Sequence, residues 1–215
     1  MKERISLLVI LFLLFPLRTR AALPLLEAGD LVFQTSDSPQ SQVIQIATGS
    51  RYSHVGIVDV SGNGQIYIVE AIARVSRTPL ASWIARGQGG RYAVFRLGGF
   101  GAGQKQAFVA AANRYLGRAY DMYFTSHNEE LYCSELVDYA ARDAGFSIGH
   151  YQRLGSLKVS DPRVIGLMKS RWQGHPLCRG LGSFSECLSN ILEDKLITPL
   201  SLTEDERLRE IYSNY

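Results

Sequence analysis

The stretch HVGIVDVSGNGQIYIVEA, residues 54–71, decides the fold. Two runs rich in β-branched residues flank the Gly/Asn turn signal SGNG, so the stretch predicts an antiparallel hairpin. His54 heads the first strand, and Glu70 interrupts the apolar second strand. An acidic residue within a buried run is seldom without a partner. Two alternatives stay open: an outward-facing Glu70, and a core His54 bonded to a carbonyl.

A well-defined helix is predicted for CSELVDYAARDAG, residues 133–145. Its apolar residues recur at helical spacing, and Gly145 ends it. Cys133 lies in or just before the first turn, where the helix dipole and unpaired N–H groups favour a thiolate.

The rest of the chain alternates strands and helices. Ser38, Pro39 and Gly49 are typical of the two ends of a helix between them. Further strands are predicted at 30–35 and 91–97, and further helices at 79–87, 104–117, 161–172, 184–196 and, as a polar terminal helix, 203–212.

The first residues have the layout of a signal peptide. Lys2 and Arg4 precede an apolar run over residues 5–15, and small residues follow at Ala21 and Ala22. The run is shorter than the roughly twenty residues that span a bilayer, although an uncleaved anchor is an alternative. We therefore expect a periplasmic or secreted protein.

The length of the chain indicates a single domain, and its charge argues against nucleic-acid binding. The 215-residue chain, 46% hydrophobic, suits one domain with a sizeable core. Its net charge of +3 is carried by the leader, where Lys2, Arg4, Arg18 and Arg20 outnumber Glu3. The remainder is nearly neutral and has no block of basic residues, so no nucleic-acid partner is predicted.

Three cysteines allow several arrangements. Cys178 and Cys187 are close enough in sequence to bridge, which would leave Cys133 odd and reactive. Alternatively, all three are free and packed, or Cys133 pairs with one of the others and the motif is structural. Zinc-like clustering of cysteine and histidine is missing, so neither a metal nor a cofactor is predicted.

A cysteine nucleophile needs a histidine base. His127, His150 and His175 occupy loop-like settings, whereas a strand would hold the ring of His54 in place. If Glu70 accepts a hydrogen bond from that ring, it fixes the tautomer and supports the charged form.

Five motifs carry a family resemblance when taken in order. They are GDLVFQ at 29–34, YSHVGIV at 52–58, YIVEA at 67–71, LGRAYD at 116–121 and YCSEL at 132–136. Together they resemble the circularly permuted branch of the NlpC-type papain-like cysteine peptidases, the bacterial permuted amidases of the YiiX and YebB type. In that branch the histidine precedes the cysteine. The resemblance covers residues 29–145.

The resemblance implies roles for five residues. Cys133 is the expected nucleophile, His54 the general base and Glu70 the orienting residue. Tyr120 and Ser134 are expected in the oxyanion or substrate pocket. Relatives often have proline before this tyrosine, where the chain has alanine.

The implied fold is α+β, a permuted papain-like fold with a small antiparallel sheet packed against helices. The expected organisation is a signal peptide at 1–22, a catalytic core at 23–150 and a mainly helical extension at 151–215, packed on the same domain.

The implied activity is cysteine-dependent amide hydrolysis through an acyl-enzyme, on cell-wall peptides or N-acyl substrates of the cell envelope. The expected partner is a peptide or acyl-amide substrate, with association at the cell wall or membrane surface. Two alternatives remain: a lipid acyltransferase or thioesterase of the same fold, and a non-catalytic binding module.

Overall fold

The computed structural model describes residues 25–126 and 128–215. The predicted signal peptide, residues 1–22, lies outside the described residues. Within the described ranges, no helix combines the length and apolar character needed to cross a membrane.

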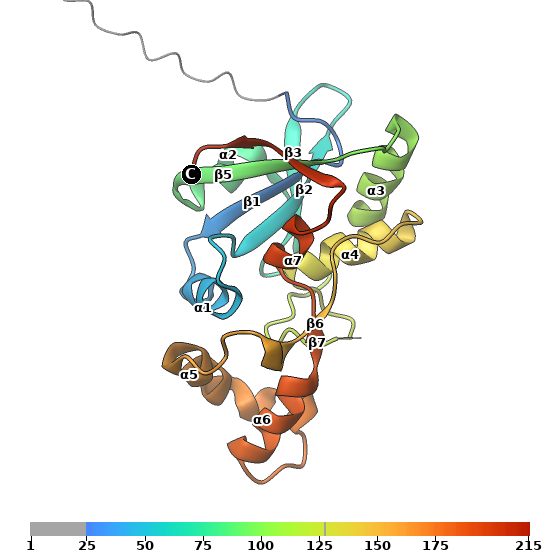
Figure 1. The fold of residues 1–215 in the computed structure, drawn as a ribbon. Coiled ribbons are helices and arrows are strands. Elements are labelled where there is room, and N and C mark those ends of the chain that lie inside the picture. Colours follow the sequence, from blue (N-terminus) through green and yellow to red (C-terminus); the bar gives the residue numbers. More distant parts are fainter. Residues whose placement is uncertain (1–24, 127) are drawn as a thin grey trace, which may run out of the picture.

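A six-stranded antiparallel sheet forms the upper part of the molecule in Figure 1. The predicted hairpin is confirmed, because β2 and β3 pair antiparallel with Ile57 opposite Val69. His54 and Glu70 therefore stand on neighbouring strands. The strand order is β4-β3-β2-β1-β5-β8, with β1 at Leu31–Ser36, β2 at His54–Val60, β3 at Ile66–Ala71, β4 at Val75–Pro79, β5 at Gly87–Leu97 and β8 at Leu208–Ser213.

Helices cover both faces of this sheet. Helices α3 (Ala102–Arg114) and α4 (Cys133–Asp143) pack on one face, and α2 (Leu80–Ala85) packs on the other. Strand β1 alternates between the two cores: Leu31 and Phe33 belong to the first, and Val32 belongs to the second. A strand buried on both faces is apolar throughout, which explains the sequence LVF at this place.

Helix α1 (Pro39–Thr48) confirms the predicted end signals. The Ser38 hydroxyl accepts a hydrogen bond from the N–H of Ser41, and Gly49 ends the helix with φ = 71°. The helix lies below the sheet in Figure 1, on the side of α5 and α6.

The lower part of the molecule is built from residues that follow α4. Two of its helices, α5 and α6, were predicted at 161–172 and 184–196 and are confirmed. The elements of this part are α5 at Pro162–Arg171, α6 at Phe184–Glu193, the 3-10 helices η1 at Leu154–Ser156, η2 at Trp172–Gly174 and η3 at Pro176–Cys178, and the short strands β6 at Gln152–Arg153 and β7 at Lys195–Leu196. Helix α7, at Pro199–Thr203, follows them and lies beside α4 in Figure 1.

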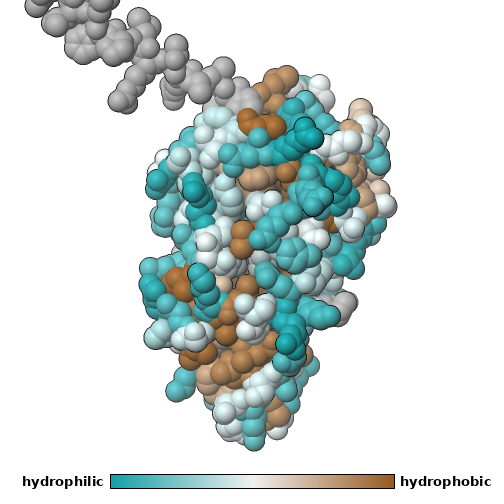
Figure 2. Space-filling model, in the orientation of Figure 1, coloured by the Kyte–Doolittle hydropathy of each residue, from teal (hydrophilic) through white to brown (hydrophobic). Residues whose placement is uncertain are grey.

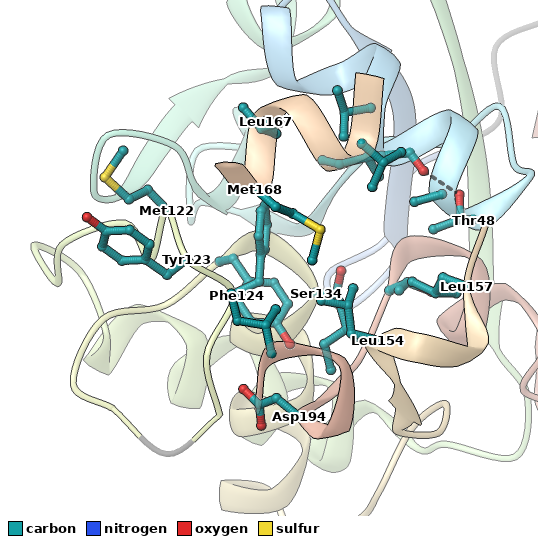
Figure 3. Close-up of a pocket in the computed structure, with 18 of the residues that line it drawn as sticks. Thr48, Met122, Tyr123, Phe124, Ser134, Leu154, Leu157, Leu167, Met168 and Asp194 are labelled. Carbon is teal, nitrogen blue, oxygen red and sulfur yellow. Dashed lines mark hydrogen bonds between the residues drawn. The ribbon is translucent and has the colours of Figure 1, made fainter. Parts of the chain in front are cut away.

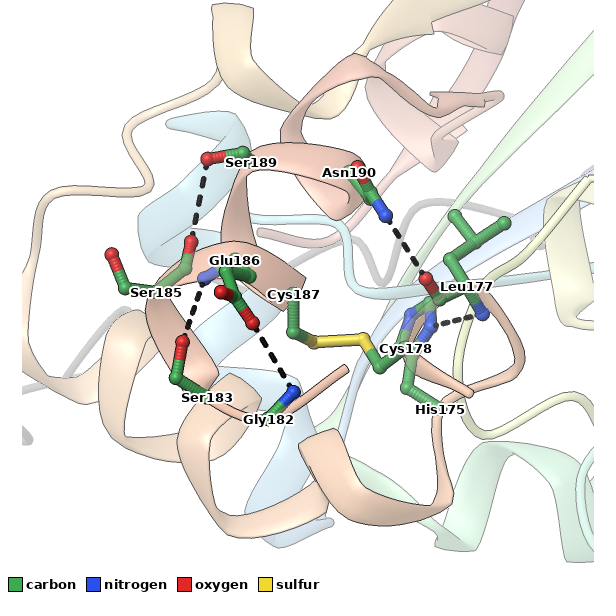
Figure 4. The surroundings of a disulfide bond; sticks show 10 residues. All are labelled: His175, Leu177, Cys178, Gly182, Ser183, Ser185, Glu186, Cys187, Ser189 and Asn190. Atoms are coloured by element: carbon green, nitrogen blue, oxygen red, sulfur yellow. Dashed lines mark hydrogen bonds between the residues drawn. A yellow bond between two sulfur atoms is a disulfide. The ribbon is translucent and has the colours of Figure 1, made fainter. Parts of the chain in front are cut away.

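A disulfide between Cys178 and Cys187 ties η3 to α6 (Figure 4). Cys133 is free. Of the arrangements left open by the sequence, the one with a bridge between Cys178 and Cys187 is therefore correct, and the interpretation of three free cysteines is wrong. The core around the bridge is small: apart from the two half-cystines, Ile191 is its one buried hydrophobic residue among the described residues. A covalent link is the usual means of stabilising so small a core.

The predicted terminal helix at 203–212 is wrong. Residues Leu208–Ser213 form strand β8, which pairs with β5. The charged residues of this segment suggested a solvated helix, but β5 leaves a free edge whose N–H and C=O groups need partners. Part of the expected extension at 151–215 therefore belongs to the sheet. Strand β4 was not predicted.

Replacing Cys178 and Cys187 together by serine is expected to lower the free energy of unfolding by about 2–3 kcal/mol, because the bridge closes a loop of about ten residues. Urea denaturation of wild type and variant measures the difference. The reducing agent dithiothreitol should bring wild type to the level of the variant and leave the variant unchanged. Equal denaturation midpoints without reductant would contradict the expectation.

Candidate active site

The histidine and the glutamate of the hairpin are in direct contact. His54 Nε2 lies 2.6 Å from Glu70 Oε2, and both residues are buried. Arg86, which directly follows α2, donates from Nη2 to the other carboxylate oxygen of Glu70. The buried carboxylate thus has a partner on each oxygen, as a buried charge requires. The outward-facing alternative for Glu70 is wrong.

Gly56 lets the two strands come close enough for this contact. A Cβ at Gly56 would collide with the side chain of Ile68 and lie 3.4 Å from the Cβ of Glu70. Any larger residue there would push β3 away from β2. Gly56, the glycine in YSHVGIV, therefore allows Glu70 to lie beside His54.

Cys133 begins helix α4 and faces the His54 ring. The thiol is buried, with 3% of the residue exposed, and it interacts with His54 and with the backbone N–H of Val55. Because Nε2 of the ring is occupied by Glu70, the nitrogen left for the thiol is Nδ1. The structure thus brings Cys133, His54 and Glu70 together in one row.

The electrostatics of this row favour an ion pair. Burial opposes the charged form of His54, but hydrogen bonds to Cys133 and Glu70 outweigh it and raise the pKa of the imidazole to about 9. Burial alone would raise the pKa of the Cys133 thiol, yet the adjacent His54 lowers it overall. The pKa of Glu70 is likewise lowered, against the effect of burial, by His54 and Arg86. Both shifts therefore favour a thiolate and an imidazolium over the neutral pair.

The two residues expected in the oxyanion or substrate pocket also lie near Cys133. The Ser134 hydroxyl is 3.8 Å from the Cys133 sulfur and is buried. Tyr120 interacts electrostatically with Cys133, and its hydroxyl oxygen accepts a hydrogen bond of 3.0 Å from Gln40 Nε2.

An apolar cavity of about 120 Å³ adjoins the thiol, and both Cys133 and Ser134 line it. Its walls come from α1, α5 and α6, from the start of α4 and the loop before it, and from residues near η1 and β7. Figure 3 shows several of these side chains around one space. The apolar lining includes Val43, Ile44 and Ala47 of α1, Val164, Leu167 and Met168 of α5, Ile191 of α6, and Phe124, Leu154, Leu157 and Leu196.

Polar groups in the cavity wall are largely engaged elsewhere. The Thr48 hydroxyl donates to the carbonyl of Ile44 at 2.8 Å (Figure 3). The Asp194 carboxylate accepts hydrogen bonds from the hydroxyl and the N–H of Ser126. The interior of the cavity therefore presents mainly hydrocarbon. On the outer surface, apolar side chains also gather in the lower part of Figure 2, where α5 and α6 lie.

The remaining histidines stand apart from the row. His150 lies 3.6 Å from Glu204, and His175 accepts a hydrogen bond at Nδ1 from the N–H of Leu177. His175 lines the cavity but does not pair with Cys133. His127 lies outside the described residues.

Sequence reasoning missed two residues that organise the site. Arg86 was taken as part of a short helix, and no local signal in the sequence points to its contact with Glu70. Asp121, the last residue of LGRAYD, accepts hydrogen bonds from the N–H groups of Tyr123, Phe124 and Thr125. It thereby shapes the loop that follows Tyr120.

Comparison with known proteins identifies the family. Residues 25–212 match the family described as permuted papain-like amidase enzyme, YaeF/YiiX, C92 family. The chain belongs to this family. The uncharacterized protein YiiX of Escherichia coli strain K12 is 40% identical over 148 residues, 68% of this chain and 73% of the relative.

A solved structure agrees with this family and fold. The crystal structure described as metalloprotein yiiX from Escherichia coli O157:H7 is 34% identical to this chain, with a TM-score of 0.77. The match covers 88% of this chain and 98% of that one. The family and the α+β permuted papain-like fold are confirmed.

The word metalloprotein in that description concerns the relative. In this chain, no three His, Cys, Asp or Glu side chains within residues 25–126 and 128–215 are grouped so that they could hold a metal ion.

Alkylation of Cys133 by iodoacetamide tests the ion pair without a substrate. We expect the thiol to react at pH 6.5 about tenfold or more faster than an ordinary thiol with a pKa of about 8.5, because His54 holds it as thiolate. His54→Ala should abolish the advantage, whereas His150→Ala, the matched control, should not. A wild-type rate that rises only above pH 8 would contradict the ion pair.

Proposed function

We propose that this protein is a cysteine hydrolase that cleaves the amide bond of N-acyl substrates through an acyl-enzyme. The observation that carries the proposal is the apolar cavity beside the Cys133 thiol, which interacts with His54, while His54 in turn contacts Glu70. A thiolate supplies the nucleophile, and the cavity supplies a place for the acyl chain.

The first half-reaction follows from the row of three side chains. The Cys133 thiolate attacks the amide carbonyl carbon, a C–S bond forms, and the carbonyl electron pair moves onto oxygen. The N–H groups at the start of α4, with the helix dipole behind them, favour the resulting oxyanion. The His54 imidazolium then donates its Nδ1 proton to the leaving nitrogen as the C–N bond breaks.

The second half-reaction returns the enzyme to its resting state. Neutral His54 accepts a proton from water, the hydroxide oxygen attacks the thioester carbon, and the C–S bond breaks. The proton on the ring is retained, so the thiolate and imidazolium pair reforms. Glu70 holds the ring in one orientation throughout and stabilises its charged form.

The apolar lining of the cavity supports one of the two substrate classes considered for this fold over the other. A cell-wall peptide presents charged and hydrogen-bonding groups, for which the hydrocarbon walls offer few partners. An acyl chain instead gains about 0.8 kcal/mol for each buried CH₂. We therefore favour N-acyl substrates. The same acyl-enzyme would also form from an ester or thioester, which keeps lipid acyl transfer as the second candidate.

Export to the cell envelope is part of the proposal. The Cys178–Cys187 bridge suits an oxidising compartment, as does the signal-peptide pattern of residues 1–22. The substrate would then be encountered at the membrane surface or in the cell wall.

Dependence on chain length tests the acyl cavity. With N-acyl 4-nitroanilides of two to sixteen acyl carbons, we expect kcat/KM to rise about tenfold or more between the shortest and the best chain. Ile44→Trp, which fills the cavity, should remove the rise. Ile46→Trp on the same helix is the matched control, because Ile46 does not line the cavity. Equal turnover of all chain lengths, or turnover of cell-wall peptides alone, would contradict an acyl substrate.

The pH profile tests the histidine. The pKa of His54 is raised from its ordinary value to about 9, so the imidazolium is fully present below pH 6.5 and is lost as the pH rises through 9. We expect kcat/KM to fall above about pH 9. Glu70→Gln should move this alkaline limb to lower pH, because the ring loses its anionic partner. An alkaline fall in kcat/KM centred near pH 6.5 in wild type would contradict the role given to the His54 imidazolium.

A further inference from the structure

A chain of hydrogen bonds runs from the C-terminal part of the protein to Tyr120. Arg171, the last residue of α5, donates from Nη1 to Gln40 Oε1 at 2.9 Å. Gln40, in the first turn of α1, donates from Nε2 to Tyr120 Oη at 3.0 Å. Arg171 also donates to the carbonyl of Met122, two residues beyond the tyrosine. Residues 131 positions apart in sequence thus meet beside the candidate nucleophile.

The direction of each bond in this chain follows from its donors. A guanidinium only donates, so the Gln40 atom facing Arg171 is the carbonyl oxygen. The amide nitrogen of Gln40 then faces Tyr120, and it too only donates. The Tyr120 oxygen is therefore the acceptor, and its own O–H proton points elsewhere. Among the described residues, the phenol O–H has no acceptor assigned to it.

The unassigned O–H lies in the neighbourhood of Cys133. Burial and the negative charge on Cys133 both raise the pKa of the Tyr120 phenol, so it stays protonated and remains a donor at neutral pH. The loop beyond it is fixed by the Asp121 carboxylate, which limits how far the tyrosine can move.

We propose that Gln40 and Arg171 are positioning residues that turn the Tyr120 O–H toward the carbonyl oxygen of the acyl group. This inference rests on the proposed function. When Cys133 attacks, the carbonyl electron pair moves onto oxygen, and Tyr120 donates a hydrogen bond to that oxyanion without transferring its proton. The cation on Arg171 polarises the amide, and the amide polarises the phenol, so each donor strengthens the next.

Helix α5 would then contribute to catalysis through Arg171, in addition to forming part of the cavity wall. Arg171 lines the cavity that adjoins the thiol, so a chain seated there would contact the residue that orients the tyrosine. The segment before residue 150 carries the nucleophile, the base, the tyrosine and Gln40, whereas Arg171, which fixes the direction of the Gln40 amide, lies after it.

Gln40→Glu is the sharpest test, since it keeps shape and packing. Glutamate still accepts from Arg171, but its second oxygen cannot donate to Tyr120 and accepts the phenol proton instead. We expect kcat on an N-acyl nitroanilide to fall about ten- to a hundredfold with little change in KM, as for the loss of an oxyanion donor. The matched control is Gln42→Glu, the same change at an exposed position of α1, which should behave as wild type.

Tyr120→Phe should produce the same fall, and the double variant Gln40→Glu/Tyr120→Phe should fall no further, because both changes remove one donor. The rate of Cys133 alkylation should be unchanged in all three, since that reaction forms no oxyanion, and their melting temperatures should not fall. Wild-type kcat in Gln40→Glu would overturn the role of Gln40. Additive losses of kcat in the double variant would overturn the inference that Gln40 acts through the Tyr120 O–H.

Binding of decanal gives a readout that does not need turnover. The aldehyde and Cys133 form a thiohemiacetal whose oxygen occupies the place of the oxyanion, and it protects the thiol against iodoacetamide. We expect Gln40→Glu and Tyr120→Phe to weaken this protection about tenfold. Unweakened protection would overturn the inference and leave the proposed function intact. A wild-type thiol that is ordinary in alkylation and unprotected by decanal would instead overturn the proposed function.

Discussion

The contact between His54 and Glu70 is the constraint on which the rest of the site depends. A carboxylate with no exposed surface is stable only when its charge is paired, and here the imidazole takes one oxygen and Arg86 takes the other. That requirement links strands β2 and β3 to helix α2. Once the ring is held in this way, its second nitrogen can face only the start of α4, where Cys133 lies.

The sheet and α4 supply the reactive groups, whereas the elements after α4 supply the surroundings. Helices α5 and α6 close an apolar cavity against α1, and the disulfide stabilises a part of the chain that has little core of its own. Catalysis and binding of an acyl chain have different physical requirements. Reactive groups require short, directed contacts between rigid elements, while an acyl site requires only hydrocarbon walls with satisfied polar groups.

Much of the site was predictable because its signals are local. The hairpin, the strand position of His54, the buried acid at Glu70 and the helix that starts at Cys133 each follow from periodicity, turn residues or helix ends within a few positions. The family motifs lie in the same region. The bridge between Cys178 and Cys187 was one of several open arrangements, since spacing alone does not say which thiols meet.

Other features depend on contacts between distant segments. The terminal residues look helical by charge pattern but form β8, because the free edge of β5 offers them partners more than a hundred residues away. Arg86 and the chain from Arg171 through Gln40 to Tyr120 were equally invisible to local patterns. The sequence by itself determined most of the helices and strands and the reactive side chains, since these follow from the preferences of neighbouring residues. Only the tertiary structure decided the cavity, the edge strand and the direction of the Tyr120 proton, because each arises where segments far apart in the chain satisfy one another's apolar surface or hydrogen bonds.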